Sequence, residues 1–371
     1  MSELVVTSGQ IVALRLFDIA FAVDLVEAES LWLRRAGGRS VRSRLSSTSP
    51  KAVAFGVPPL AISLDPLRIV LPTGPVEVAV TARLFDFGAV SVALRLAASE
   101  RPWAEYVWLL NALARASGPG SDEDVWSGPL DAIRRALDPA MTRPGVSSVQ
   151  EDYLLGIVHA FDAQPTAAEL LQSIDLVPLL SGEQRTLSEG ARSDLLRQRF
   201  SYYTDDLVVL TWDRAFIYEP RGDSDVADVL EVANAQLLEM RYYDALLDDE
   251  LPRMYTLVEG ARRGIQAFGA RRYAGLARRL YTMVAEVTEL MERVDNALQV
   301  TEDVYLARIY AAALETFRVR PVAAAVDRKL AIIRDTYTAL YDEASSSRSE
   351  MLEIVVVVLI VLEVVLAIVH P

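Results

Sequence analysis

The sequence predicts an α+β protein: a head of two similar strand-hairpin-helix halves, then an all-helical, coiled-coil-like segment and one C-terminal transmembrane helix. Three observations predict this class, namely hairpin signals with β-branched alternation before residue 220, seven-residue periodicity after it, and an apolar run at the end. The expected domains are a first half at 1–116, a linker at 117–147, a second half at 148–220, a helical bundle at 221–348 and a membrane anchor at 350–369.

The two halves share one predicted order of elements. Each begins with a strand and a helix, near residues 11–33 in the first half and near 153–171 in the second. A hairpin follows in each half, with its turn at 86–88 or at 212–214, and each hairpin precedes a further helix. This shared order indicates an internal duplication.

Beyond residue 220, apolar residues at four-three spacing predict two long helices that pair. One seam comprises Leu276, Leu280, Met283, Val287, Leu290, Val294 and Ala297, and the other Val326, Leu330, Ile333, Tyr337, Leu340 and Ala344. A helix from about Asp223 is expected to end at Pro252, and a shorter helix after Thr301 is expected to end at Pro321.

Residues 351–369 are apolar except for Glu353 and Glu363, and fifteen of them are Val, Leu or Ile. Their length approaches the roughly 20 residues of a membrane span. The N-terminus shows no export or transit signal, and basic residues such as Arg348 precede the run. We therefore expect a single-pass C-terminal membrane anchor with a cytoplasmic head; the alternative is a buried helix or strand of a soluble core.

The net charge of −14 argues against sequence-independent nucleic-acid binding by the chain as a whole, and the lack of cysteine excludes disulfides and thiolate chemistry. There is no phosphate-binding glycine loop, serine elbow or zinc-binding helix motif. His159 falls in an apolar strand pattern typical of a satisfied core histidine. We expect no enzyme activity, no catalytic or metal-binding residues and no cofactor.

One local feature departs from the overall acidity. Six arginines lie within eighteen residues that contain no acidic side chain: Arg262, Arg263, Arg271, Arg272, Arg278 and Arg279. Such a cluster suits phosphate groups of RNA or of lipid headgroups. The alternative is a helix surface whose arginines pair with Asp248, Asp249, Glu250 and Glu259.

The end of the chain carries a family resemblance. The residues concerned are the segment 303–310, Arg328-Lys329-Leu330, Tyr337, and Leu352-Glu353-Ile354 followed by Leu359-Ile360 and Glu363-Val364. Over roughly residues 300–370 this pattern resembles the required-for-meiotic-nuclear-division family. The resemblance implies a membrane-anchored C-terminus, self-assembly and support of translation, with the ribosome as a partner by analogy. It implies no catalytic residues.

These features favour a membrane-tethered, self-associating scaffold or assembly protein, linked by the resemblance to translation or division machinery. Glu363 lies ten residues into the expected span, where an ionisable group normally faces a partner, so we expect a homo-oligomer with Glu363 at the helix association site. Two alternatives stay open. One is an RNA- or anionic-lipid-binding adaptor acting through the arginine cluster, and the other is a ligand-sensing or enzymatic head with a cleft between the two halves.

Overall fold

The computed structural model describes residues 4–36, 53–55, 57–121, 123–145, 147–183, 185–222, 225–262, 275, 278, 280–282, 284–289, 291–292, 298–300 and 304–369. The chain divides into two compact units. Unit 1 comprises residues 1–242 and 293–320, and unit 2 comprises residues 243–292 and 321–371. Each unit is considered by itself.

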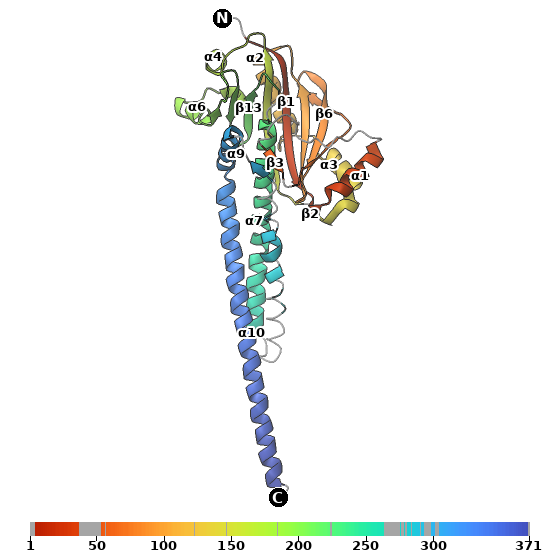
Figure 1. Ribbon diagram of the computed structural model, residues 1–371, viewed down its shortest axis with the longest axis vertical. Helices are drawn as coiled ribbons and strands as arrows, with labels where there is room; N and C mark the ends of the chain where they lie inside the picture. Colours follow the sequence, from red (N-terminus) through yellow and green to blue (C-terminus); the bar gives the residue numbers. More distant parts are fainter. Residues whose placement is uncertain are drawn as a thin grey trace. The chain divides into compact units, whose positions relative to one another are not determined.

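Unit 1 is built on a ten-stranded sheet, in which β1 and β10 pair at the centre (Figure 1). The strand order is β11-β12-β13-β10-β1-β7-β6-β4, with β5 also on β6 and β8 also on β1. The strands are β1 (Val5–Asp18), β4 (Leu60–Ser63), β5 (Leu67–Leu71), β6 (Gly74–Leu84), β7 (Ala89–Ala97), β8 (Arg101–Pro102), β10 (Gln150–Phe161), β11 (Arg199–Phe200), β12 (Leu207–Leu210) and β13 (Arg214–Tyr218). Two small pairs complete the strands described: β2 (Ala20–Val23) with β9 (Met141–Pro144), and β3 (Val53–Phe55) with β14 (Leu298–Val300).

Both predicted hairpins are confirmed. β6 pairs with β7, and β12 pairs with β13, each antiparallel. Gly88, in the turn of the first hairpin, has φ of 102°, and a Cβ there would lie 1.7 Å from the carbonyl oxygen of Ala20. Only glycine fits this turn, because it combines a left-handed backbone with close approach to a neighbouring chain segment.

The predicted duplication is wrong in its topology. β7 runs antiparallel to β1, whereas β13 runs parallel to β10, so the two hairpins join the central pair in different ways. Instead of two similar halves, unit 1 is one mixed sheet with helices. Hairpin signals are local and carry no information about which neighbouring strand a hairpin will join or in which direction.

One face of the sheet packs against α2 (Trp103–Ser117). The Tyr106 hydroxyl donates to the carbonyl oxygens of Gln10 and Ile157, at 3.0 and 3.2 Å. Gly156 permits this approach, since a Cβ at that position would lie 2.9 Å from Leu110. The other helices of unit 1 before residue 220 are α1 (Leu25–Ala36), α3 (Ser127–Leu137), η1 (Asp138–Ala140), α4 (Ala167–Ser173), α5 (Val177–Ser181) and α6 (Glu189–Leu195).

The opposite face contacts the first part of α7 (Val226–Arg262) and α9 (Val304–Thr316). The Arg241 guanidinium on α7 lies 2.7 Å from the Glu151 carboxylate on β10. The ring of Tyr153 on β10 packs edge-on against Phe317, directly after α9, with centroids 5.2 Å apart. These contacts place helices from late in the chain on strands from its first half.

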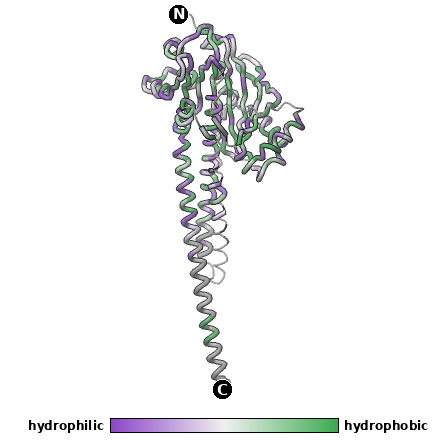
Figure 2. The backbone as a smooth tube through the Cα atoms, viewed as in Figure 1, coloured by the Kyte–Doolittle hydropathy of each residue, from purple (hydrophilic) through white to green (hydrophobic). Residues whose placement is uncertain are grey.

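Unit 2 pairs the rest of α7 with α10 (Val319–Val369) around a narrow apolar seam. Among the seam members whose side chains the structure describes, Leu280, Val287, Val326, Leu330 and Ile333 are buried and Tyr337 is half-buried. Apolar and polar residues alternate along the described part of α10 in Figure 2. The Lys329 ammonium lies 2.6 Å from both Asp244 and Asp248 on α7, which fixes the register of the pair.

Two predicted helix ends are wrong, and both involve proline. Pro252 lies inside α7, which continues ten residues beyond it. Pro321 lies in the first turn of α10, where a missing N–H leaves no hydrogen bond unmade. The chain instead turns at Arg318, whose φ is +59°. The segment after residue 220 is also not wholly helical, because it contains β14.

The predicted membrane anchor is contradicted. Among the residues that the structure describes, no helix combines the length and the apolar character that crossing a membrane requires. The fold class and the localisation predicted from residues 350–369 are corrected accordingly. The apolar run is the end of one helix that begins at Val319 and carries charged residues such as Asp327 and Lys329 in its first part, whereas the sequence pattern suggested a separate apolar helix.

Candidate functional site

The strongest concentration of buried charge lies where α7 meets the sheet of unit 1. All residues of α7 from 229 to 240 are buried. Four of them are polar, namely Glu231, Asn234, Gln236 and Glu239, and the exposed fraction of Glu239 is only 1%. Buried polar side chains require partners, because an uncompensated group loses its hydration.

Arg83 on β6 supplies the positive charge. Its guanidinium lies 2.7 Å from Asp228 and 2.8 Å from Glu231, which are one helical turn apart on α7. Burial alone lowers the pKa of Arg83, but the charges of Glu231 and Asp228 outweigh it and hold the pKa above the ordinary value. One buried arginine therefore holds two carboxylates of α7 on the sheet.

A hydroxyl lies beside this ion cluster without a hydrogen bond. Ser91 on β7 is the register partner of Arg83 and is completely buried. Within the described part of the chain, its Oγ has no hydrogen-bond partner. Such a group costs about 1–3 kcal/mol relative to a satisfied one.

The end of β1 adds a carboxyl with an altered proton affinity. Asp18 is 8% exposed, and burial raises its pKa to about 7, against a smaller lowering by the Ala20 backbone N–H. The pKa of Tyr242 on α7 is raised first by burial and then by the charges of Asp18 and Glu239, while Arg143 opposes the shift. Asp18, Glu239, Tyr242 and Arg143 therefore interact electrostatically, and the Asp18 carboxyl titrates near neutral pH.

Hydrogen bonds fix the helices around the cluster. The Tyr310 hydroxyl on α9 donates to Gln236 at 2.6 Å. The Tyr153 hydroxyl donates to the carbonyl oxygens of Thr211 and Arg214, at 3.0 and 2.9 Å, and so ties β10 to the turn of the second hairpin. The arrangement holds buried charge, and burial raises the pKa of the Asp18 carboxyl to about 7.

The sequence analysis did not identify this cluster. The signal was present, because Arg83 interrupts an apolar alternation in β6 and α7 carries carboxylates three residues apart. A charged residue in an otherwise apolar element can be assigned to the interior only when its buried partner is known. The partner's identity depends on a contact between residues 145 positions apart.

The predicted arginine cluster falls mostly outside the described residues. This applies to Arg263, Arg271, Arg272 and Arg279. Arg262 is the last residue of α7, with its side chain outside the description, and Arg278 is exposed. Glu363 lies within α10, and its side chain is likewise outside the description. The roles of these residues stay predictions.

His159 and Asp206 have hydrogen-bond partners among the described residues. His159 Nδ1 lies 3.2 Å from the Glu219 carbonyl oxygen, in agreement with a satisfied histidine. Asp206 accepts from the backbone N–H groups of Tyr202 and Tyr203. In the described part of the chain, no group of three or more acidic or histidine side chains could hold a metal ion.

The fold and cluster define unit 1 as a mixed-sheet domain with a helix held on it by buried ion pairs. Residues 8–225, more than half of the chain, match the family model described as "Uncharacterized protein MJ0711, N-terminal domain", so the chain belongs to that family. It is 26% identical over 193 residues to "Uncharacterized protein MJ0711" of Methanocaldococcus jannaschii, a match that covers 52% of this chain and 58% of that protein. The chain thus spans less than two thirds of this relative. No solved structure matches the chain.

The family membership shown by the comparisons differs from the one predicted from the sequence. The resemblance to the required-for-meiotic-nuclear-division family is contradicted, because the family that matches is a different one. The resemblance used residues 300–370, where heptad periodicity and aliphatic runs recur among unrelated helices. The match instead covers the sheet-forming region. A ribosome partner was implied by that resemblance alone, and no comparison tests it.

Proposed function

We propose that this chain is a self-associating assembly protein, with the interface between copies on the C-terminal part of α10. The supporting observation is the exposure of four aliphatic side chains there. Val356, Val357, Leu359 and Ile360 are 52–57% exposed, and they form the green stretch near the end of α10 in Figure 2. A contiguous apolar surface of this kind marks an interaction site in a folded protein.

The spacing of these residues suits a helix-on-helix contact. Val356, Leu359 and Ile360 stand at i, i+3 and i+4, so they share one face of α10. Glu363 follows Val356 by seven residues, and therefore continues the same row. A polar residue in such a row selects the register and number of associating helices at some expense of affinity. This is the role that we propose for Glu363.

The test compares the mass of the full chain with that of a surface variant. We expect light scattering of the wild type to give a dimer or larger assembly that dissociates on dilution. The triple variant Val356→Ser, Leu359→Ser, Ile360→Ser should raise the dissociation constant at least about 100-fold, since burying each aliphatic side chain contributes roughly 1.5–3 kcal/mol.

A matched control variant replaces two exposed valines of unit 1 by serine. Val26 and Val70 are 66% and 59% exposed, and Val26→Ser with Val70→Ser should leave the assembly unchanged. A monomeric wild type across the micromolar range contradicts the proposal. So does a wild type that associates only with lipid vesicles and not with itself.

A further inference from the structure

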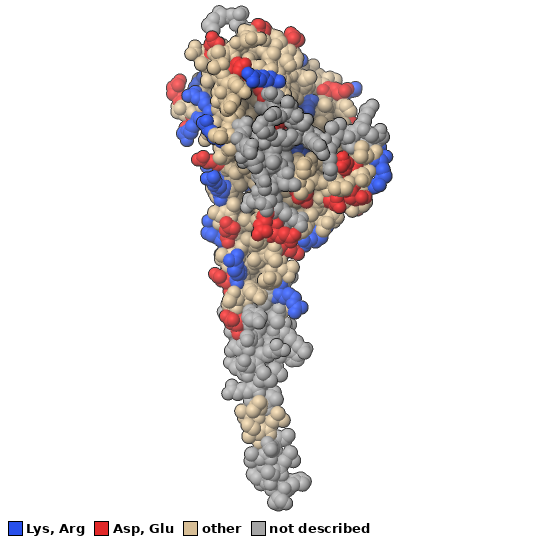
Figure 3. Space-filling model, in the orientation of Figure 1, with Lys and Arg blue, Asp and Glu red and all other residues tan. Residues whose placement is uncertain are grey.

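A hollow on unit 1 is lined by arginine side chains, and two exposed tyrosines follow the last of these arginines by three and four residues in the chain. The hollow has a volume of about 480 Å³ and is lined by Glu189, Arg192, Ser193, Leu196, Arg197 and Arg199. The lining comes from one face of α6, continued into the start of β11. Three of the six lining residues are arginines and only one is acidic. Basic side chains gather on the side of unit 1 that carries α6 in Figure 3.

The arginines of the hollow are available to a ligand. Arg199 is exposed, and within the described residues its side chain makes no ion pair or hydrogen bond. Arg197 pairs with Asp194, one helical turn before it, and both side chains are about 70% exposed. Arg192 is held by Asp175 at 3.2 Å and stays one-third exposed. Exposed ion pairs contribute little free energy, so phosphate oxygens can replace these carboxylates.

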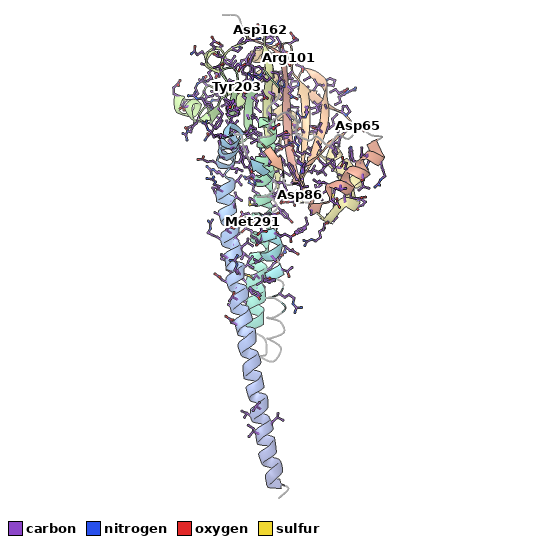
Figure 4. The ribbon with its side chains drawn as sticks, in the orientation of Figure 1. Asp65, Asp86, Arg101, Asp162, Tyr203 and Met291 are labelled. Carbon is purple, nitrogen blue, oxygen red and sulfur yellow. The ribbon has the colours of Figure 1, made fainter. Side chains whose placement is uncertain are left out.

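Aromatic rings follow directly along the chain. Tyr202 and Tyr203 are 63% and 45% exposed, and their rings meet edge-to-face with centroids 4.8 Å apart. The Tyr202 ring rests on Tyr305 of α9, at 5.4 Å. The Arg221 guanidinium lies 4.0 Å from the centre of the Tyr203 ring, which Figure 4 labels.

The turn that carries the two tyrosines is fixed before any ligand arrives. The Asp206 carboxylate accepts from the N–H groups of Tyr202 and Tyr203, at 2.7 and 3.2 Å. The Ser201 hydroxyl donates to the Tyr203 and Asp206 carbonyl oxygens. Rings held in place lose little conformational freedom when a ligand stacks on them.

We propose that this surface, formed by the arginines of the hollow and by Tyr202 and Tyr203, binds single-stranded nucleic acid. Phosphates lie against Arg192, Arg197 and Arg199, and bases stack on the tyrosines. Planar forked guanidinium groups with exposed aromatic rings are the combination that such ligands require, because the phosphates need charge and the bases need a ring face. The chain's net charge of −14 repels nucleic acid at long range, so binding is local and depends on salt.

The test measures fluorescence anisotropy of a labelled mixed-sequence 12-nucleotide RNA with the full chain. DNA of the same sequence and double-stranded RNA form separate arms. We expect both single strands to bind and the duplex to bind more weakly. Since about two to three phosphates meet arginines, log affinity should fall with log salt with a slope of about −2.

Two variants separate charge from stacking. Arg197→Gln with Arg199→Gln should weaken binding about 10-fold or more and flatten the salt dependence. Tyr202→Ala with Tyr203→Ala should weaken binding about 10- to 100-fold, with the salt dependence retained. The matched controls, Arg34→Gln with Arg35→Gln on α1 and Tyr255→Ala on α7, should bind as the wild type does.

Ultraviolet crosslinking of the wild type keeps the proposal testable if a variant fails to fold. The crosslinked peptide should contain Tyr202 and Tyr203. Absence of single-strand binding at 50 mM salt overturns the proposal, as does preferential binding of the duplex. Crosslinks confined to other parts of the chain, or full binding by both double variants, also overturn it.

Discussion

Unit 1 buries charged side chains, whereas unit 2 leaves apolar side chains exposed. In unit 1, Arg83 and Glu231 form a buried ion pair between the sheet and α7. In unit 2, the seam around Leu330 is narrow, and the aliphatic side chains near Ile360 face outward. Unit 1 covers its buried charges within one domain, whereas the C-terminal part of α10 exposes the aliphatic side chains through which we propose that two copies associate. Buried ion pairs restrict a helix to one position on the sheet, whereas an exposed row of apolar side chains is typical of an interaction surface.

The largest effect should come from Arg83, because removing it leaves carboxylates buried without their counter-charge. We expect Arg83→Met to lower the free energy of unfolding of unit 1 by about 3–5 kcal/mol. Urea denaturation followed by tryptophan fluorescence measures this. Adding Asp228→Asn and Glu231→Gln should restore part of the loss. A change under 1 kcal/mol, similar to that of the exposed control Arg34→Met, would show that the ion pairs do not hold α7.

The seam of unit 2 should respond next. Leu330 is 4% exposed, and Leu330→Ala should cost about 3 kcal/mol through lost burial and a residual cavity. Ile332 on the same helix is 42% exposed, so Ile332→Ala should cost well under 1 kcal/mol. Hydrogen exchange of residues 321–342 gives the local stability. Equal effects of the two variants would mean that the seam is not at Leu330.

Asp18 should make the stability of unit 1 depend on pH. Its pKa is about 7 in the folded chain against an ordinary 3.8, so between these values the folded state binds more protons than the unfolded state. Stability should therefore fall by about 2 kcal/mol as the pH rises from about 5 to about 8. Burial raises the pKa of Glu151 and Asp213 in the same direction, so the contribution of Asp18 is a difference between variants.

That difference is obtained by comparing Asp18→Asn with the exposed control Asp65→Asn across the same pH range. Asp18→Asn should flatten the profile, and Asp65→Asn should leave it as in the wild type. Identical profiles in all three proteins would place the proton uptake elsewhere.

The smallest effect should come from Ser91, whose buried Oγ has no hydrogen-bond partner among the described residues. Ser91→Ala removes an unsatisfied polar atom with little change in volume. We therefore expect the free energy of unfolding, measured by thermal denaturation, to rise by about 1 kcal/mol. Ser63→Ala, at an exposed position, is the control. A loss of more than 1 kcal/mol would indicate that Ser91 has a partner, such as a bound water.

Local features of the fold were predictable from sequence, and long-range ones were not. The glycine turn at Gly88 and the polar turn at 212–214 identified both hairpins because turn chemistry acts within a few residues. The parallel pairing of β13 with β10 depends on packing across the chain, so a duplication with equal halves was the wrong inference. Pro252 misled for a related reason, because packing of a long helix can outweigh one lost hydrogen bond.

The candidate sites also differ in how far the sequence predicted them. Arg83 and its carboxylates were invisible as a set, since their meeting depends on a sheet-to-helix contact. The arginine hollow was also missed, because its residues are spread along 189–199 among acids and show no unbroken basic run. The aliphatic end of α10 was recognised in sequence, but its context as part of a 51-residue helix was not.

The most direct test of self-association is sedimentation velocity of the full chain at several concentrations, alone and with the triple serine variant of Val356, Leu359 and Ile360. We expect the wild type to sediment as a dimer or larger species at micromolar concentration and the variant to sediment as a monomer with unchanged helix content. A wild type and variant that sediment identically as monomers would contradict it.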